Sequence, residues 1–217
     1  MGNLSRSALT PRGYREPMAP TQWSSDVLAT DDGIAVPCSV IGEQNSWGVV
    51  LAHPHPGFGG DRHHPLVRAI GERVAMAGGW AIAPALRVDG ANENPPVGPL
   101  DDLQAAVSAC YDATGRTPMA VGYSFGAGLI THLAAEMSLR AVVLVAPPAN
   151  MMRLPPPPAD AVLFVGEHDT VVTPDSLADW APDHDRRVIP GTDHFFVGHI
   201  APLADDIATV LLAHSTA

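Results

Sequence analysis

Short, uninterrupted apolar runs alternate along this chain with segments of helical spacing, and this alternation restricts the fold more than any other feature. Runs expected to form strands occupy residues 33–42, 47–53, 80–86, 119–124, 140–148, 161–169 and 186–191. Segments expected to form helices occupy residues 64–79, 99–115, 125–137, 173–182 and 200–214. Strands that are apolar along their whole length are buried on both faces, so the pattern predicts an α/β fold with a mostly parallel sheet between two layers of helices. Pro37 in the first run predicts a position near a sheet edge.

The length and composition fit one globular domain. A chain of 217 residues that is 46% apolar is large enough to bury a sizeable core. We expect the domain to span residues 23–217, because residues 1–22 are polar, contain scattered prolines and follow neither period, which predicts a flexible arm. The chain has no apolar stretch that could span a membrane and does not begin like a secretory signal. Together with two isolated cysteines, Cys38 and Cys110, these features predict a cytoplasmic protein.

The charged residues exclude several functions. The formal net charge is −11, and all 12 basic residues are arginines. An acidic chain without a basic stripe is not expected to bind nucleic acid. Because the chain has no lysine, mechanisms that depend on one, such as Schiff-base formation or a P-loop phosphate clamp, are excluded.

Polar clusters follow four of the expected strands directly. In a doubly wound sheet, binding sites form at the carboxyl ends of the strands. The clusters are "HPHPGFGGD" at 53–61, "GYSFG" at 122–126, "EHD" at 167–169 and "GTDHFF" at 191–196. They bring a serine, an acid and histidines to one edge of the sheet, and these are the residue types that nucleophilic catalysis uses.

Ser124 is the candidate nucleophile. It is the serine of a G-x-S-x-G pattern between an expected strand and an expected helix. A nucleophile on such a turn has a strained backbone that exposes its hydroxyl, and the strain requires small residues on both sides, here Gly122 and Gly126. The alternative is a structural serine that caps the following helix. The position at a strand-to-helix junction favours the nucleophile.

His194 is the candidate base. A serine hydroxyl is a weak nucleophile and needs a neighbouring group to accept its proton. Among the 10 histidines of the chain, His194 lies at a turn after the last expected strand, where an imidazole can reach the sheet edge. Four others lie within expected helical regions or before the last strand: His132, His184, His199 and His214.

Asp169 is the candidate acid that orients His194. It lies directly past the expected strand at 161–169. Two other acids compete with it, Glu167 and Asp193. Glu167 would point to the opposite side if the strand continues, and Asp193 is adjacent to His194, where side chains rarely face each other.

A tetrahedral oxyanion needs two N–H donors. The first is expected to be the backbone amide of Phe125, the residue after the nucleophile. The second should come from the loop at 53–60, where Pro54 and Pro56 have no N–H. His55, Gly57 and Phe58 remain as donors, and we favour the amide of His55.

The same loop raises the alternative of a metal site. Its ligands would come from His53, His55, Asp61, His63 and His64. However, the H-x-H-x-D-H pattern of metal-dependent hydrolases would need an acid at position 57, which is a glycine here. We therefore expect no metal and no other cofactor.

Taken together, "HPHPGFGGD", "GYSFGAG", "VGEHDTVVTP" and "PGTDHFF" resemble the α/β-hydrolase superfamily, in particular small uncapped hydrolases related to dienelactone hydrolases and short-chain carboxylesterases. The resemblance covers the chain from about residue 30 onward. It implies a Ser-His-Asp triad at Ser124, His194 and Asp169, and hydrolase activity on esters or related acyl compounds. The chain departs from this group at 84–98, where an arginine- and glycine-rich loop is shortened and altered.

The segment between the expected strands at 140–148 and 161–169 is too short to form a helical cap, so the site should be open. Four residues are candidate walls of the substrate pocket, with ordinary packing or loop surface as the alternative: Phe58, Met151, Met152 and Phe195. The sequence thus predicts a cytoplasmic serine hydrolase that cleaves small acyl esters through an acyl-enzyme. The alternatives are thioester or lactone hydrolysis with the same residues, or a non-catalytic module that binds a ligand or partner.

Overall fold

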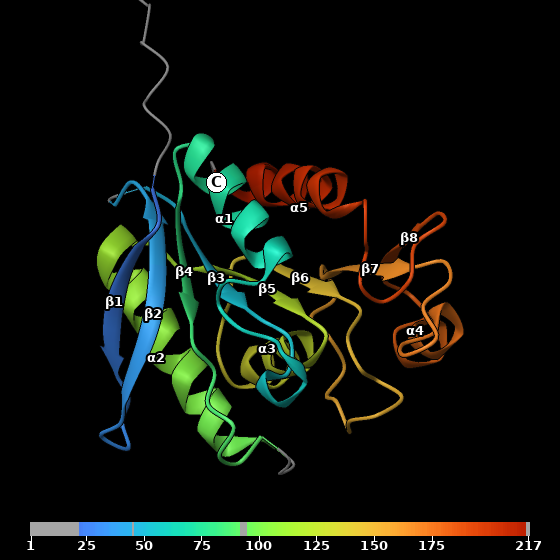
Figure 1. Cartoon of the computed structure of the whole chain (residues 1–217), viewed down its shortest axis with the longest axis horizontal. Coiled ribbons are helices and arrows are strands. Elements are labelled where there is room, and N and C mark those ends of the chain that lie inside the picture. Colours follow the sequence, from blue (N-terminus) through green and yellow to red (C-terminus); the bar gives the residue numbers. More distant parts are fainter. Residues whose placement is uncertain (1–21, 45, 92–94, 216–217) are drawn as a thin grey trace, which may run out of the picture.

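Eight strands form one sheet in the order β1-β2-β4-β3-β5-β6-β7-β8 in the computed structural model, which describes residues 22–44, 46–91 and 95–215 (Figure 1). The strands are β1 (Ser24–Ala29), β2 (Ala35–Gly42), β3 (Gly48–Ala52), β4 (Trp80–Pro84), β5 (Met119–Tyr123), β6 (Val142–Val145), β7 (Val162–Gly166) and β8 (Asp185–Ile189). β2 pairs antiparallel with β1 and with β4, whereas every other neighbouring pair is parallel. The mostly parallel sheet predicted from the sequence is confirmed.

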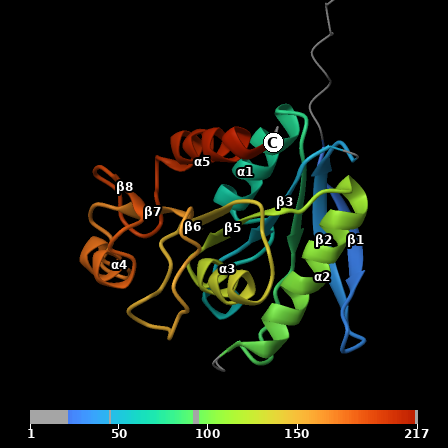
Figure 2. The same ribbon diagram turned by 180° about the vertical axis from the view of Figure 1, so that it is seen from behind.

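Helices cover both faces of this sheet. α1 (Pro65–Met76) and α5 (Ile200–Ser215) pack on one face, in front in Figure 1. α2 (Val97–Thr114) and α3 (Phe125–Glu136) pack on the other, which Figure 2 shows from behind. The short α4 (Pro174–Trp180) lies near β7 and β8 at one end of the sheet (Figure 1).

Apolar burial on both faces explains why the central strands are so uniform. Every residue of β3, β4, β5, β6 and β7 is buried. Alternate side chains of these strands enter two apolar clusters, one beneath α1 and α5 and one beneath α2 and α3. Each large apolar side chain buried in this way contributes about 1.5–3 kcal/mol relative to an exposed one.

The structure has an edge strand, β1, that the sequence did not predict. Leu28 is the one buried residue of β1, so no apolar run or alternation marks the strand in the sequence. β2 carries Pro37 and lies one strand in from the edge, where Pro37 is paired with Val27 of β1. The expected flexible arm falls almost wholly on residues 1–21, which lie outside the described residues.

The segment between β6 and β7 and the two cysteines complete the description of the fold. Residues 146–161, between β6 and β7, contain no helix, so the fold has no cap domain there. Cys38 and Cys110 are buried free thiols, and burial raises their pKa values to about 11 and about 12. Within the described ranges, no helix combines the length and apolar character needed to cross a bilayer.

Candidate active site

Ser124 lies at the turn from β5 into α3 with a backbone that few residues other than glycine adopt. Its φ is 53° and its ψ is −118°. The turn is tight, because a Cβ on Gly122 would lie 2.4 Å from the carbonyl oxygen of Gly126, and a Cβ on Gly126 would lie 2.3 Å from that of Ala52. Neither contact is tolerable, so both glycines of the G-x-S-x-G pattern are required by the geometry of the turn.

The hydroxyl of Ser124 does not cap α3. The helix begins at Phe125, and the Ser124 side chain makes no capping hydrogen bond to it. Its Oγ lies instead 3.1 Å from Nε2 of His194. The backbone of Ser124 is tied down separately, because its N–H donates to the carbonyl of Val145 over 2.8 Å. The structural alternative of a capping serine is therefore not what the geometry shows.

Asp169 contacts the other ring nitrogen of His194. Its Oδ2 lies 2.8 Å from His194 Nδ1, and the residue as a whole is 3% exposed. The second oxygen, Oδ1, accepts the N–H groups of Val171 and Val172 over 2.9 and 2.7 Å. Because an ionised carboxylate can only accept, the proton belongs on Nδ1, and Nε2 is left to accept from Ser124. The three candidate residues thus form one chain of hydrogen bonds.

The two competing acids are engaged elsewhere. Asp193 Oδ1 accepts the N–H of Phe195 over 3.0 Å in a local turn. Glu167 Oε2 accepts the N–H of Gly191 over 2.8 Å. Both contacts hold the loop that carries His194, but neither reaches its imidazole.

Of the three backbone N–H groups in the loop after β3 that could bind an oxyanion, two are already used in hydrogen bonds within the loop. The N–H of Gly57 donates to His55 Nδ1 over 3.0 Å, and the N–H of Phe58 donates to the carbonyl of His55 over 3.0 Å. Within the described part of the chain, the N–H groups of His55 and Phe125 have no acceptor. The rings of His55 and Phe125 are 4.6 Å apart, edge to face, so the two free donors lie on touching segments. These are the two N–H groups that the sequence proposes as oxyanion donors, and that role stays a prediction.

Three histidine rings of this segment, those of His53, His55 and His64, contact backbone groups. His53 is 1% exposed, its Nδ1 lies 2.6 Å from the carbonyl of Pro54, and its Nε2 accepts the N–H of Leu86 over 3.0 Å. Burial lowers the pKa of His53 to about 4, so the ring is neutral at ordinary pH. His64 Nδ1 accepts the N–H of Leu66 and so caps α1. Among the described residues, no group of three or more potential ligands is arranged to hold a metal ion.

The loop after β4, which departs from the pattern of similar proteins, is anchored by an ion pair. Arg87 binds the buried carboxylate of Asp102 over 2.7 Å and also contacts Asp32 in the β1–β2 turn. The Arg87 hydrogen bond lowers the pKa of Asp32 to about 2. This guanidinium is therefore held by two carboxylates, and the neighbouring N–H of Leu86 is held by His53.

The four candidate pocket residues are not equivalent. Phe58, Met151 and Phe195 are exposed, at 89, 66 and 62%. Met152 is partly buried and packs against α3 at Gly128. Phe58 and Phe195 lie beside the rings of His55 and His194, with centroids 5.1 and 5.6 Å away. Phe58 and Phe195 are therefore exposed rings next to site histidines, whereas Met152 packs on α3, and a role of any of them in a substrate pocket stays a prediction.

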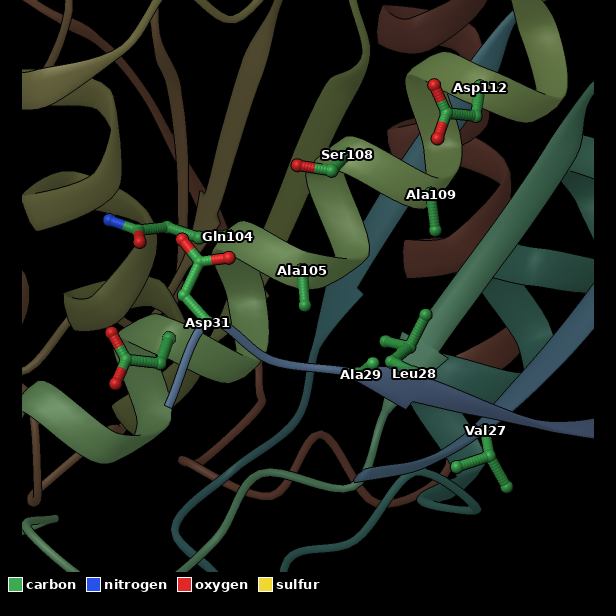
Figure 3. Close-up of a pocket in the computed structure, with 10 residues that line it drawn as sticks. Val27, Leu28, Ala29, Asp31, Gln104, Ala105, Ser108, Ala109 and Asp112 are labelled. Carbon is green, nitrogen blue, oxygen red and sulfur yellow. The ribbon is translucent and has the colours of Figure 1, made fainter. Parts of the chain in front are cut away.

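A hollow of about 260 Å³ lies elsewhere, between β1 and α2 (Figure 3). Its polar lining comes from Asp31, Asp101, Gln104, Ser108 and Asp112. None of the candidate catalytic residues lines it. Catalysis at Ser124 would therefore not use this hollow.

Tyr123 is a residue of the site that the sequence did not single out. Its hydroxyl donates to the carbonyl oxygen of His194 over 2.6 Å. The two residues are 71 positions apart in the chain, so no local spacing could have revealed the contact.

Comparison with known proteins identifies the fold. No protein-family model matches the chain, and no curated protein is significantly similar in sequence. Among solved structures, an α/β serine hydrolase without a lid from Xanthomonas campestris matches with a TM-score of 0.76 and 22% identity, over 93% of this chain and 99% of the other. A dienelactone hydrolase from Anabaena variabilis matches with a TM-score of 0.74 and 20% identity, over 91% of this chain and 100% of the other. An esterase from Pyrococcus furiosus matches with a TM-score of 0.70 and 14% identity, over 94 and 99%. The chain has the α/β-hydrolase fold without a cap.

Proposed function

We propose that the protein is a serine hydrolase that cleaves short-chain acyl esters through a covalent acyl-enzyme. The observation that carries this proposal is the unbroken chain of hydrogen bonds from Asp169 through His194 to Ser124, with Ser124 at a φ of 53°. A serine held only for structure would have no need of a strained backbone, nor of an imidazole oriented by a buried carboxylate. The similarity in fold to a lidless serine hydrolase, an esterase and a dienelactone hydrolase supports the proposal.

The chemistry follows from the positions of the protons. Ser124 Oγ attacks the ester carbonyl while His194 Nε2 accepts its proton, and Asp169 stabilises the imidazolium that forms. The oxyanion is bound by the N–H groups of Phe125 and His55, which have no other acceptor within the described residues. His194 then protonates the leaving alcohol. Water, deprotonated by the same nitrogen, attacks the acyl-enzyme and releases the acid.

The preference for small substrates rests on the shape of the site. No helix lies between β6 and β7, and the nearby apolar side chains Phe58 and Phe195 are exposed rather than gathered around a deep cavity. A shallow site can bury a short acyl group but gives little binding energy to a long one. We propose a small-molecule acyl substrate, acted on in the cytoplasm without a cofactor.

Covalent labelling tests the nucleophile. Wild-type protein should react with a fluorophosphonate probe at one site, and Ser124→Ala should not react, because the attacking oxygen is gone. Retained labelling in Ser124→Ala, or no labelling of the wild type, would refute the assignment. Ser176→Ala is a matched control, since Ser176 is a partly exposed serine in α4 whose hydroxyl donates to the carbonyl of Thr173, the N-cap residue of that helix.

The substrate is tested by a panel of p-nitrophenyl esters with acyl chains of increasing length, together with thioesters and lactones. We expect kcat/KM to be highest for acetyl to butyryl esters and to fall with longer chains. Higher kcat/KM for thioesters or lactones would keep the mechanism and replace the substrate class. A preference for long acyl chains would contradict the shallow site.

A further inference from the structure

The loop that carries His194 needs support from outside itself. Residues 191–198 contain three positions in the left-handed region, and one of them, Phe196, is not a glycine and has a φ of 51°. Such a backbone is unfavourable for a residue with a Cβ and persists only where surrounding contacts fix it. An imidazole can hold its position against Ser124 only if the backbone beneath it is fixed as well.

Tyr123 supplies a contact to that backbone. Its hydroxyl donates to the carbonyl oxygen of His194 over 2.6 Å, in a buried setting. Its ring also packs on Phe196, the residue with the unfavourable φ, with centroids 6.1 Å apart. Burial raises the pKa of the phenol, with nearby Asp169 adding to the effect, so the hydroxyl keeps its proton and remains a donor.

Tyr123 is the neighbour of the nucleophile in the chain, so its contact with His194 affects how the base is placed relative to the nucleophile. Tyr123 is the last residue of β5 and is bonded directly to Ser124. The nucleophile and the base are therefore connected twice, once through Ser124 Oγ and His194 Nε2, and once through the Tyr123 hydroxyl and the His194 carbonyl. The hydrogen bond from the Tyr123 hydroxyl to the His194 carbonyl does not change when the proton moves from Ser124 to His194. It can therefore hold the distance between the serine and the imidazole throughout the reaction.

We propose that Tyr123 is a positioning residue, whose hydroxyl fixes the main chain of His194 so that the imidazole stays aligned with Ser124. This proposal rests on the proposed function, because it assumes that Ser124 and His194 react. It assigns a role to the first variable position of the G-x-S-x-G pattern in this chain.

Tyr123→Phe tests the proposal, because it removes one oxygen and leaves the ring in place. The matched control is Tyr111→Phe, the same chemical change at a half-exposed tyrosine on α2. We expect Tyr123→Phe to lower kcat and the rate of fluorophosphonate labelling about tenfold, because an imidazole whose main chain is no longer held is less often aligned with Ser124, with KM within about twofold. Tyr111→Phe should match the wild type in all three. Both kcat values are expressed per active site titrated with the probe, so unfolded protein does not enter the comparison.

The outcomes separate this proposal from the one it rests on. If the wild type is not labelled, the proposed function fails first. If the wild type is labelled and Tyr123→Phe has the same labelling rate and kcat, Tyr123 has no positioning role, even if its melting temperature is lower. A higher KM with unchanged kcat would also overturn the proposal, because it would indicate a pocket residue. Should Tyr123→Phe not fold, the three tyrosines are replaced by 3-fluorotyrosine. Its more acidic hydroxyl is a stronger donor, so labelling should be faster than in the wild type, and a rate equal to or below that of the wild type would overturn the proposal.

Discussion

Two histidine-rich loops lie at the same edge of the sheet and use their imidazoles in different ways. In the loop after β3, the His53 ring bonds two backbone groups and the His55 ring bonds a third. In the loop after β8, the His194 ring bonds only side chains, Asp169 on one nitrogen and Ser124 on the other. The first arrangement shapes a loop, and the second leaves a nitrogen that can exchange a proton with a reactant. What a histidine does here is decided by its partners, not by its place at the sheet edge.

The largest effect should come from removing the one imidazole that faces side chains. His194→Ala should lower kcat for a short-chain ester by about 10⁴-fold or more, because Ser124 loses its base. His63→Ala, at an exposed histidine of the loop after β3, should stay within about twofold of the wild type. Steady-state kinetics on both variants measure the difference. Comparable losses in the two would erase the distinction between the loops.

The buried ring of His53 should instead make stability depend on pH. Its pKa is lowered to about 4 in the folded protein against 6.5 in a free side chain, so between these values the unfolded chain binds a proton that the native ring does not. The contribution is fully present above pH 6.5 and is lost as the pH falls towards 4, by about 3 kcal/mol in total. Asp61, His64 and Arg62 are the charged or titratable groups that also act on this ring.

Urea unfolding at several pH values between 7.5 and 4.5 measures this effect. The comparison is with His53→Gln, which can still accept the N–H of Leu86 but does not titrate. The stability of the wild type should fall more steeply with decreasing pH than that of the variant. Parallel curves would mean that His53 is not held neutral by its surroundings.

The smallest effect should come from the exposed mouth of the site. Phe58 is 89% exposed, so Phe58→Ala should change the free energy of unfolding by no more than about 0.5 kcal/mol. If its ring covers the acyl group, KM for a butyryl ester should rise about threefold with kcat unchanged. Met76→Ala, at an 81% exposed residue of α1, is the control for removing an exposed apolar side chain. An unchanged KM would leave Phe58 as loop surface.

The sequence predicted the layers of this fold because the central strands are apolar along their whole length. It did not predict β1, where a single buried residue, Leu28, gives no periodic signal. The register and order of the strands depend on contacts between distant segments, such as β3 pairing with both β4 and β5, and no local pattern encodes them.

In the candidate site, too, features with a local sequence signal could be predicted, whereas features that depend on contacts between distant segments could not. Ser124, Asp169 and His194 could be proposed because each follows an expected strand, so parallel pairing brings them to one edge. Which N–H groups remain free could not be predicted, since Gly57 and Phe58 differ from His55 only in the acceptors that the folded loop provides. Tyr123 could not be found at all, because its partner is the main chain of a residue 71 positions away.

The helix-free segment at 146–161 has a consequence for what the protein can reach. A capped hydrolase must admit its whole substrate through an entrance before Ser and His can act. Here this segment supplies no helix that could cover the turn carrying Ser124, so we expect that only the acyl group has to enter the site while the alcohol extends towards solvent. We therefore expect the alcohol part of a small ester substrate to be less restricted in size than its acyl part.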